Sequence, residues 1–352
     1  MPSKKRPPTI GLVLGGGGIA GYAFHAAVLR AVTGHTGFDP RTAEVIVGTS
    51  AGSIAGALLR GAVPASAIAD RLWAAEDDPQ ELANLRLLAG RSSRVVPRFW
   101  TGIGSTPMTI RELRRGRRMK LARLAGGLLP DGRLTLDPII RPLDGLHGAA
   151  WPEQALWIPA TDRTTGRRVV FGRDRFPRVA EAVRASAALP GFFAPAEIED
   201  RTYIDGGLGS QHNADLLADH RTAGTGRTAG EPLDLVIVSA PLSIDELSGR
   251  VPMASAIRAV PRRQLQEEIL KIEAVGTKTL VFEPDNRVTR SMGLNPMNHH
   301  RIRSILTATD RMTHQDLAVV DDSILRLLEG AGRLLRSPPD VPYPEITVAE
   351  GG

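Results

Sequence analysis

The chain has 352 residues, of which 42% are hydrophobic and 4% aromatic, and it carries a formal net charge of +6. This hydrophobic content supports a sizeable core and excludes a largely disordered protein. The chain has no cysteine, which excludes disulfides, thiolate metal sites and a cysteine nucleophile.

The basic charge suits nucleic acid, an anionic membrane surface, or an arginine-rich surface without a specific partner. Few aromatic residues and no zinc-finger spacing are present, so we expect no nucleic-acid partner. Residues 1–8 are basic and proline-rich, lack the apolar segment of a signal peptide, and are expected to be disordered. Because no apolar run approaches the ~18 residues that cross a bilayer, we expect a cytoplasmic protein.

The first sixty residues alternate between strand and helix patterns. A strand at 9–14 enters a glycine turn and a helix at 19–32, and a strand at 44–47 is followed by a helix at 53–59. Such a βαβα unit predicts an α/β fold with a parallel sheet that is covered by helices.

The rest of the chain continues the α/β pattern. Residues 64–130 have helical patterns broken by proline, and a polar loop is expected at 221–231. Further strands are predicted at 157–161, 168–172, 202–204, 233–239 and 278–282, and helices at 179–188, 258–275 and 297–328. We expect one domain over 9–330, with a helical cap at about 64–150 and a tail at 331–352.

Gly48, Ser50 and Gly52 form a G-x-S-x-G motif between a predicted strand and a predicted helix. A serine nucleophile needs such a sharp turn to expose its hydroxyl, and the flanking glycines remove side chains that would collide with the turn. The alternative is an ordinary turn in which Ser50 caps the helix.

The run from Gly15 to Gly21 also joins a strand to a helix. Consecutive glycines leave backbone amides bare, and these amides can converge on an anion such as the oxyanion of acyl transfer. The run also fits the dinucleotide-binding pattern, but that pattern requires an acidic residue at the end of the second strand. Glu44 lies at the start of that strand and not at its end, so we favour an oxyanion-binding loop over a dinucleotide-binding one.

A base for Ser50 is harder to find. Ser50, Asp205 and His212 follow the order of an α/β-hydrolase triad. However, only two strands precede Ser50, and His212 lies too close to Asp205 in the chain to come from a separate loop. We therefore do not favour a histidine base.

Three features occur together in order: the glycine run, Gly48 to Gly52, and Asp205-Gly206-Gly207. With the stretches 185–193, 160–166 and 293–297, they resemble the patatin-like phospholipase family over roughly 9–330, except for 64–150. The resemblance implies a three-layer α/β/α fold with a mostly parallel central sheet. One departure is Ala20, which stands where the family usually has arginine or lysine.

The same resemblance implies a serine acyl-hydrolase that cleaves carboxylic esters of lipids. It assigns Ser50 as nucleophile and Asp205 as base, without histidine, metal or cofactor. In this assignment the amides of Gly16, Gly17 and Gly18 bind the oxyanion, and Gly206 and Gly207 let the backbone turn. Burial is expected to raise the pKa of Asp205. A catalytically silent lipid-binding or regulatory protein on the same scaffold remains the alternative, and the oligomeric state is left open.

Residues 111–123 hold six arginines and one lysine against a single acid, with leucines that could share a helix face. Such a stretch can lie on an anionic membrane as a peripheral contact, or it can form the solvated face of a cap helix.

Overall fold

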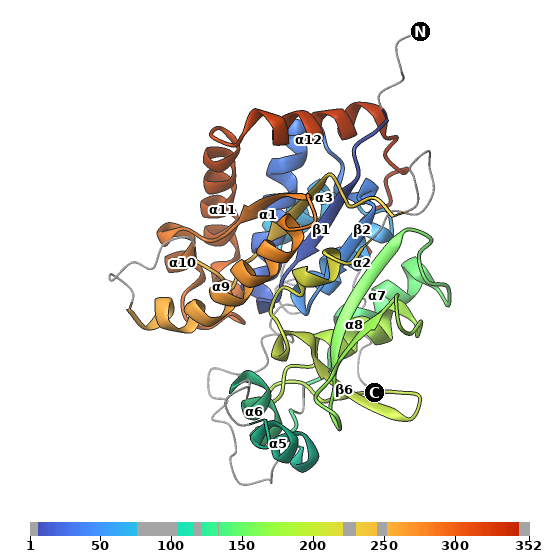
Figure 1. Ribbon diagram of the computed structural model, residues 1–352, viewed down its shortest axis with the longest axis vertical. Helices are drawn as coiled ribbons and strands as arrows, with labels where there is room; N and C mark the ends of the chain where they lie inside the picture. The colour runs from blue at the N-terminus through green and yellow to red at the C-terminus, as the bar shows by residue number, and fades with distance from the viewer. Residues whose placement is uncertain are drawn as a thin grey trace.

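The computed structural model describes residues 6–75, 105–115, 121–132, 134–220, 230–244 and 252–344, and Figure 1 shows their arrangement. A mixed sheet runs through the molecule in the order β5-β6-β3-β2-β1-β7-β8, and β4 pairs with β3. The strands are β1 (Ile10–Leu14), β2 (Val45–Gly48), β3 (Ala155–Asp162), β4 (Arg168–Phe171), β5 (Ala196–Ile198), β6 (Arg201–Asp205), β7 (Leu235–Ser239) and β8 (Lys278–Phe282).

The five strands from β3 to β8 in this order are mutually parallel, whereas β4, β5 and β6 pair antiparallel. Successive side chains of a strand point to opposite faces. Accordingly, Leu12 and Leu14 of β1 join one buried cluster and Val13 joins another. The sheet is therefore buried on both faces.

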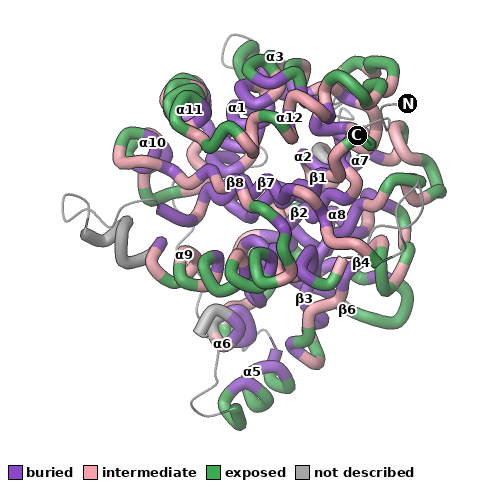
Figure 2. The backbone as a smooth tube through the Cα atoms, turned by 45° about the horizontal axis from the view of Figure 1, so that its top comes forward, coloured by how far each residue is buried: buried purple, intermediate pink, exposed green. Residues whose placement is uncertain are grey.

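Most helices cover the face on which Leu12 and Leu14 lie, and Figure 2 shows α9 on the opposite side. The first group is α1 (Gly18–Thr36), α2 (Ala51–Arg60), α3 (Ala65–Ala74), α7 (Asp137–His147), α8 (Val179–Ala187), α10 (Asn286–Met292), α11 (Ile302–Leu317) and α12 (Asp322–Leu334). The second face is covered by α9 (Pro252–Glu273) and the short helix η5 (Ala214–Leu217). The predicted three-layer α/β/α fold is confirmed.

Two further helices, α5 (Thr106–Leu113) and α6 (Leu121–Leu128), lie beside each other at one end of the molecule (Figure 1). They fall in the segment predicted as a helical cap. Residues 76–104 and 116–120 of that segment lie outside the described residues, as do residues 1–5 at the N-terminus and most of the loop expected at 221–231.

The predicted strands and helices match described elements in kind, with ends that shift by a few residues, except that the stretch predicted as helical at 297–328 forms two helices, α11 and α12. Elements that were not predicted individually include β5, which has three residues, α10, which has seven, and α7, which lies in the segment expected as a helical cap. The boundary expected at residue 330 lies inside α12, and residues after this helix still contact the domain, since the Val341 amide donates to the Ala62 carbonyl at 3.1 Å.

Among the described helices, none is both long and apolar enough to cross a membrane.

Candidate active site

Ser50 lies in the sharp turn between β2 and α2. Its backbone has φ 52° and ψ −118°, a conformation that is strained for any residue with a side chain. Its amide donates to the Ser186 hydroxyl at 3.0 Å, which in turn donates to the Pro159 carbonyl at 2.7 Å. The Ser50 side chain does not cap α2, so the alternative of a helix-capping serine is wrong.

Close backbone approach explains the two glycines of the motif. A Cβ at Gly52 would lie 2.0 Å from the Leu14 carbonyl oxygen, and a Cβ at Gly48 would lie 2.6 Å from the Gly52 oxygen. Neither position can hold a side chain while β1, β2 and α2 keep their places. The strain at Ser50 is thus maintained by tight packing around it.

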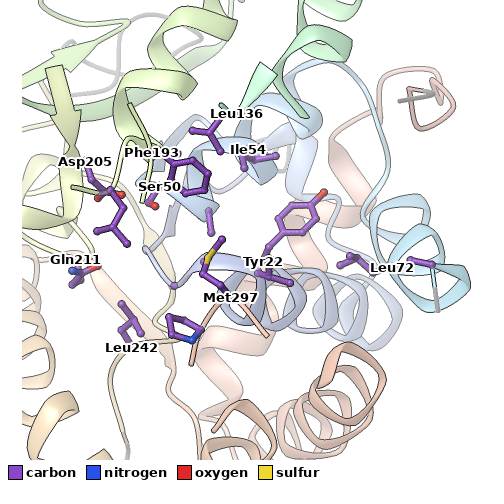
Figure 3. Close-up of a pocket in the computed structure, with 18 of the residues that line it drawn as sticks. Tyr22, Ser50, Ile54, Leu72, Leu136, Phe193, Asp205, Gln211, Leu242 and Met297 are labelled. Carbon is purple, nitrogen blue, oxygen red and sulfur yellow. The ribbon is translucent and has the colours of Figure 1, made fainter. Parts of the chain in front are cut away.

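Asp205 ends β6, where it pairs with Ala160 of the neighbouring strand β3. Strand β3 also pairs with β2, and this brings Asp205 level with the turn that carries Ser50. The Ser50 side chain lies beside the Asp205 carboxyl and lowers its pKa, and the Gly207 amide donates to the Asp205 Oδ1 at 2.6 Å. Figure 3 shows the two side chains together at one end of a pocket.

The Asp205 side chain is buried, and burial raises its pKa to about 6 against the opposing effects of the Gly207 amide and the Ser50 side chain. A carboxylate with a raised pKa is a stronger base than one in water, and near neutral pH it remains mostly ionised. The direction agrees with the expectation from the sequence.

Gly206 is required by close backbone approach, and Gly207 leaves space for the side chains of Gln211 and Asp205. A Cβ at Gly206 would lie 2.2 Å from the Pro159 carbonyl oxygen, and one at Gly207 would lie 2.7 Å from Gln211 Oε1. Neither glycine has a positive φ. The backbone turns at Gly206–Leu208 without a left-handed conformation, and close packing is the reason for the glycines that the structure shows.

The glycine run after β1 lies beside the serine turn because β1 and β2 are parallel neighbours, with Leu14 opposite Gly48. Gly17 and Gly18 line the same pocket as Ser50. The Gly16 amide instead donates to the Gln211 carbonyl at 2.8 Å. The prediction of Gly16 as a free amide donor is therefore wrong, and Gly17 and Gly18 are the candidates that remain.

The start of α1 is held by the stretch 293–297. Gly18 has φ +59°, and a Cβ there would lie 2.8 Å from Met297 Sδ. Ala20, the departure from the family pattern, donates its amide to the Pro296 carbonyl at 2.9 Å. These contacts fix the glycine run although the family's usual basic residue is absent.

His25 supports the glycine run from inside the core. Burial lowers its pKa to about 4, so the ring is neutral at pH 7. Its Nε2 lies 2.8 Å from the Gly15 carbonyl oxygen and therefore carries the proton, while Nδ1, 2.7 Å from Ser239 Oγ, accepts from that hydroxyl. His25 thus fixes the orientation of the peptide group that leads into Gly16 and Gly17.

His212 does not form a triad with Ser50 and Asp205. Its ring is fully buried, and neither ring nitrogen has a hydrogen-bond partner within the described part of the chain. Burial lowers its pKa to about 3, so it is neutral and packs against Gly15. The three-member arrangement is therefore not formed.

The loop that carries His212 is tied to the serine turn. Asn213 Nδ2 donates to Thr49 Oγ1 at 3.0 Å, and the Ala214 amide donates to the carboxyl of Glu268 at 2.8 Å. Burial raises the pKa of Glu268 to about 7. These contacts hold the segment after Asp205 in place against Thr49.

A mostly apolar pocket of about 170 Å3 opens next to Ser50. In Figure 3 its wall runs from Ser50 and Asp205 past Phe193 and Met297 toward Tyr22. Further lining residues include Ile19, Ile54, Leu72, Leu136, Leu189 and Leu242. The nucleophile candidate therefore faces a space suited to a hydrocarbon chain.

Sequence reasoning missed the roles of Ser186, Gln211 and His25. Ser186 lies in a stretch that resembles the family, but nothing in that stretch singles out its hydroxyl. Gln211 acts through its backbone carbonyl, which has no sequence signal. His25 did carry a signal, because it is a polar residue among buried alanines of α1.

In the described residues no group of His, Cys, Asp or Glu side chains is placed to hold a metal ion.

A serine beside a buried carboxyl at a strained turn, on a three-layer α/β/α scaffold, defines the class of site found in serine hydrolases.

The family model described as "Patatin-like phospholipase" matches residues 12–218, more than half of the chain. The protein therefore belongs to the patatin-like phospholipase family, which supports lipid ester hydrolysis as its general activity. Comparison with curated protein sequences found no match.

Among solved structures, VipD from Legionella pneumophila is 15% identical with a TM-score of 0.38, and 89% of this chain and 67% of that chain are covered. The ExoU–SpcU complex from the type III secretion system of Pseudomonas aeruginosa is 18% identical with a TM-score of 0.35, with coverage of 93% and 58%. This chain thus spans about three fifths to two thirds of those chains.

Proposed function

We propose that the protein is a serine acyl-hydrolase that cleaves carboxylic esters of lipids with Ser50 and Asp205 as a catalytic dyad. The observation that carries the proposal is the position of the Ser50 side chain beside a buried carboxyl whose pKa is raised to about 6. A lone serine in a turn would have no base, whereas here a buried carboxyl that could accept the proton lies beside the proposed nucleophile.

In the first half of the reaction, the Asp205 carboxylate takes the Ser50 proton as Oγ forms a bond to the ester carbonyl carbon. The amides of Gly17 and Gly18 donate to the resulting oxyanion; one such donor is typically worth about 3 kcal/mol of barrier. The carbon–oxygen bond to the alcohol then breaks, and Asp205 returns the proton to the leaving oxygen.

In the second half, a water molecule attacks the acyl-enzyme carbonyl and gives one proton to Asp205. Collapse of the second oxyanion breaks the bond to Ser50 Oγ, and Asp205 returns the proton to this oxygen. The free fatty acid leaves, and serine and carboxylate regain their starting states. No metal or cofactor enters either half.

The apolar lining of the pocket favours a lipid acyl chain over a small polar acyl group. Phe193, Leu136 and Met297 surround the space next to Ser50. Burial of methylene groups against such side chains stabilises the bound ester by about 0.8 kcal/mol per group. Phospholipids, lysophospholipids and glycerolipids all carry the required acyl ester.

Within the segment expected as a cap at 64–150, α3 and α7 belong to the helical layer on the sheet, and we propose that α5 and α6 form a cap through which the enzyme contacts an anionic membrane. Ile110 and Leu113 of α5 are 45% and 56% exposed, and Leu128 of α6 is 47% exposed. Arg111 lies on α5, and Arg114 and Arg115 follow directly after this helix; all three are exposed. Apolar and cationic groups side by side suit the interface of an anionic bilayer.

The cap also lies close to the site. A Cβ at Gly126 of α6 would lie 2.8 Å from Leu208, which ends the turn that begins with Asp205. Membrane contact at α5 and α6 would therefore bring lipid near the dyad. Arg117, Arg118 and Lys120, part of the predicted basic stretch, lie outside the described residues.

A fluorophosphonate probe tests the dyad directly. Wild-type protein should be labelled and should release fatty acid from a panel of phospholipid, lysophospholipid and glycerolipid vesicles. Ser50→Ala should lose both properties, and Asp205→Asn should lose turnover. Ser304→Ala, which removes an exposed serine on α11, is the matched control and should keep both. Folded wild-type protein without labelling or turnover would instead support a silent lipid-binding protein.

A further inference from the structure

The segment after α12 returns to the domain near the candidate active site. The Asp340 carboxylate pairs with Arg41 at 2.8 Å, and the Val341 amide donates to the Ala62 carbonyl at 3.1 Å. Arg41 is itself buried and also pairs with Asp39. The segment is therefore anchored to Arg41 and to the loop between α2 and α3.

This anchoring places Tyr343 on the wall of the pocket that holds Ser50. The hydroxyl of Tyr343 lies 3.1 Å from that of Tyr22, with which it forms a hydrogen bond. The Arg71 guanidinium carbon lies 5.5 Å from the centre of the Tyr343 ring, within the range of a cation–π contact. All three side chains line the pocket.

These polar groups lie at the end of the pocket away from the dyad. Figure 3 shows Ser50 and Asp205 on one side and Tyr22 and Leu72 on the other, with Phe193 and Met297 between them. Tyr22 follows Gly18 by four residues of α1, or roughly 6 Å along the helix axis. The wall is therefore apolar next to Ser50 and polar about one helical turn further on.

We propose that Tyr343, paired with Tyr22 and stacked on Arg71, ends the acyl pocket and limits the length of the chain that the enzyme accepts. A short acyl chain stays within the apolar part. A long chain must pass the two hydroxyls and the guanidinium and would disrupt the contacts that they make with one another. The inference rests on the proposed function, and it assigns specificity to a residue outside the range 12–218 matched by the family model.

The test compares kcat/KM for p-nitrophenyl octanoate and hexadecanoate in three proteins. Wild type should prefer octanoate by about tenfold or more, and Tyr343→Ala should raise the hexadecanoate-to-octanoate ratio by about tenfold. Pro342→Ala, which changes the exposed neighbour, should leave the ratio unchanged. Thermal unfolding shows whether each variant is folded. An unchanged ratio in folded Tyr343→Ala, or a wild-type preference for hexadecanoate, overturns the proposal.

A binding measurement separates this proposal from the catalytic one. Calorimetry on Ser50→Ala and on Ser50→Ala/Tyr343→Ala with octanoate and hexadecanoate needs no turnover. The quantity compared is the affinity for hexadecanoate divided by the affinity for octanoate. A higher ratio in the double variant than in Ser50→Ala supports the limit on chain length, even if wild type hydrolyses no ester and the proposed function fails. The same ratio in both variants overturns the limit on chain length, even if hydrolysis is observed.

Discussion

Replacement of Asp205 by asparagine should abolish activity and stabilise the fold above pH 6. Burial raises the pKa of Asp205 from 3.8 to about 6. The difference is about two pKa units, each worth about 1.4 kcal/mol, so an ionised Asp205 destabilises the folded state by about 3 kcal/mol. Because the folded pKa exceeds the unfolded one, this destabilisation is absent below pH 3.8 and complete above about pH 6.

The expected change in melting temperature follows from the chain length. An unfolding entropy of roughly 2.1 cal/mol/K per residue gives about 0.7 kcal/mol/K for 352 residues, so removal of the charge raises Tm by at most about 4 °C. An asparagine keeps one oxygen that can accept from Ser50 or Gly207, but it lacks the second acceptor oxygen. This loss makes the rise in Tm smaller.

Thermal unfolding of wild type and Asp205→Asn at pH 8, 6 and 4.5 measures the effect. The Tm difference should be largest at pH 8 and should shrink at pH 4.5, where the native carboxyl is protonated. Asp200→Asn, which neutralises an exposed aspartate, is the matched control and should show no such trend. A variant that is no more stable than wild type at pH 8, or a difference independent of pH, would refute the argument that burial opposes ionisation of Asp205.

Three further predictions concern the base, the serine turn and the glycine run. The profile of kcat/KM against pH should fall on the acid side with a midpoint near 6, the value to which burial raises the pKa of Asp205. Gly52→Ala should destabilise by about 3 kcal/mol or more because its Cβ would lie 2.0 Å from the Leu14 carbonyl oxygen, whereas Gly34→Ala, with open space, should not, as measured by urea unfolding. His25→Ala should lower kcat by about tenfold or more, with little change in KM, because the peptide after Gly15 loses its support. His147→Ala removes a comparable contact with the Ala57 carbonyl, far from the glycine run, and should lower Tm without this loss of kcat.

The backbone elements were predictable because each central strand is a run of apolar residues that ends at glycine or a turn. β1 and β2 meet at Leu14 and Gly48, so two motifs whose first glycines are 33 residues apart, Gly15 and Gly48, necessarily lie side by side. Outside the segment expected as a cap, the elements that escaped prediction are short. β5 exposes Glu197 between two buried residues, and three residues cannot establish a period.

The fine structure of the site was less predictable. Gly16, Gly17 and Gly18 are equivalent in sequence, and only the fold shows that Gln211 occupies the amide of the first. That hydrogen bond joins backbone groups 195 residues apart. Every residue has the same backbone carbonyl, so the residue types do not show which carbonyl accepts from Gly16. Likewise, the glycines after Asp205 are explained by contacts with Pro159 and Gln211, which no local pattern contains.

The same burial that strengthens a carboxylate base weakens a histidine base, and this gives a physical reason for the proposed dyad of Ser50 and Asp205. Desolvation disfavours the charged form of either group. For a carboxyl the charged form is the base, so burial raises the pKa of Asp205 to about 6 and brings it close to neutral pH. For imidazole the charged form is the conjugate acid, and burial lowers the pKa of His25 to about 4 and of His212 to about 3. In a pocket dry enough to bind an acyl chain, an unpaired histidine would thus be a weaker base than the aspartate that is present. A histidine base would need a second carboxylate to restore its pKa, as in a triad, whereas a buried aspartate needs no third group.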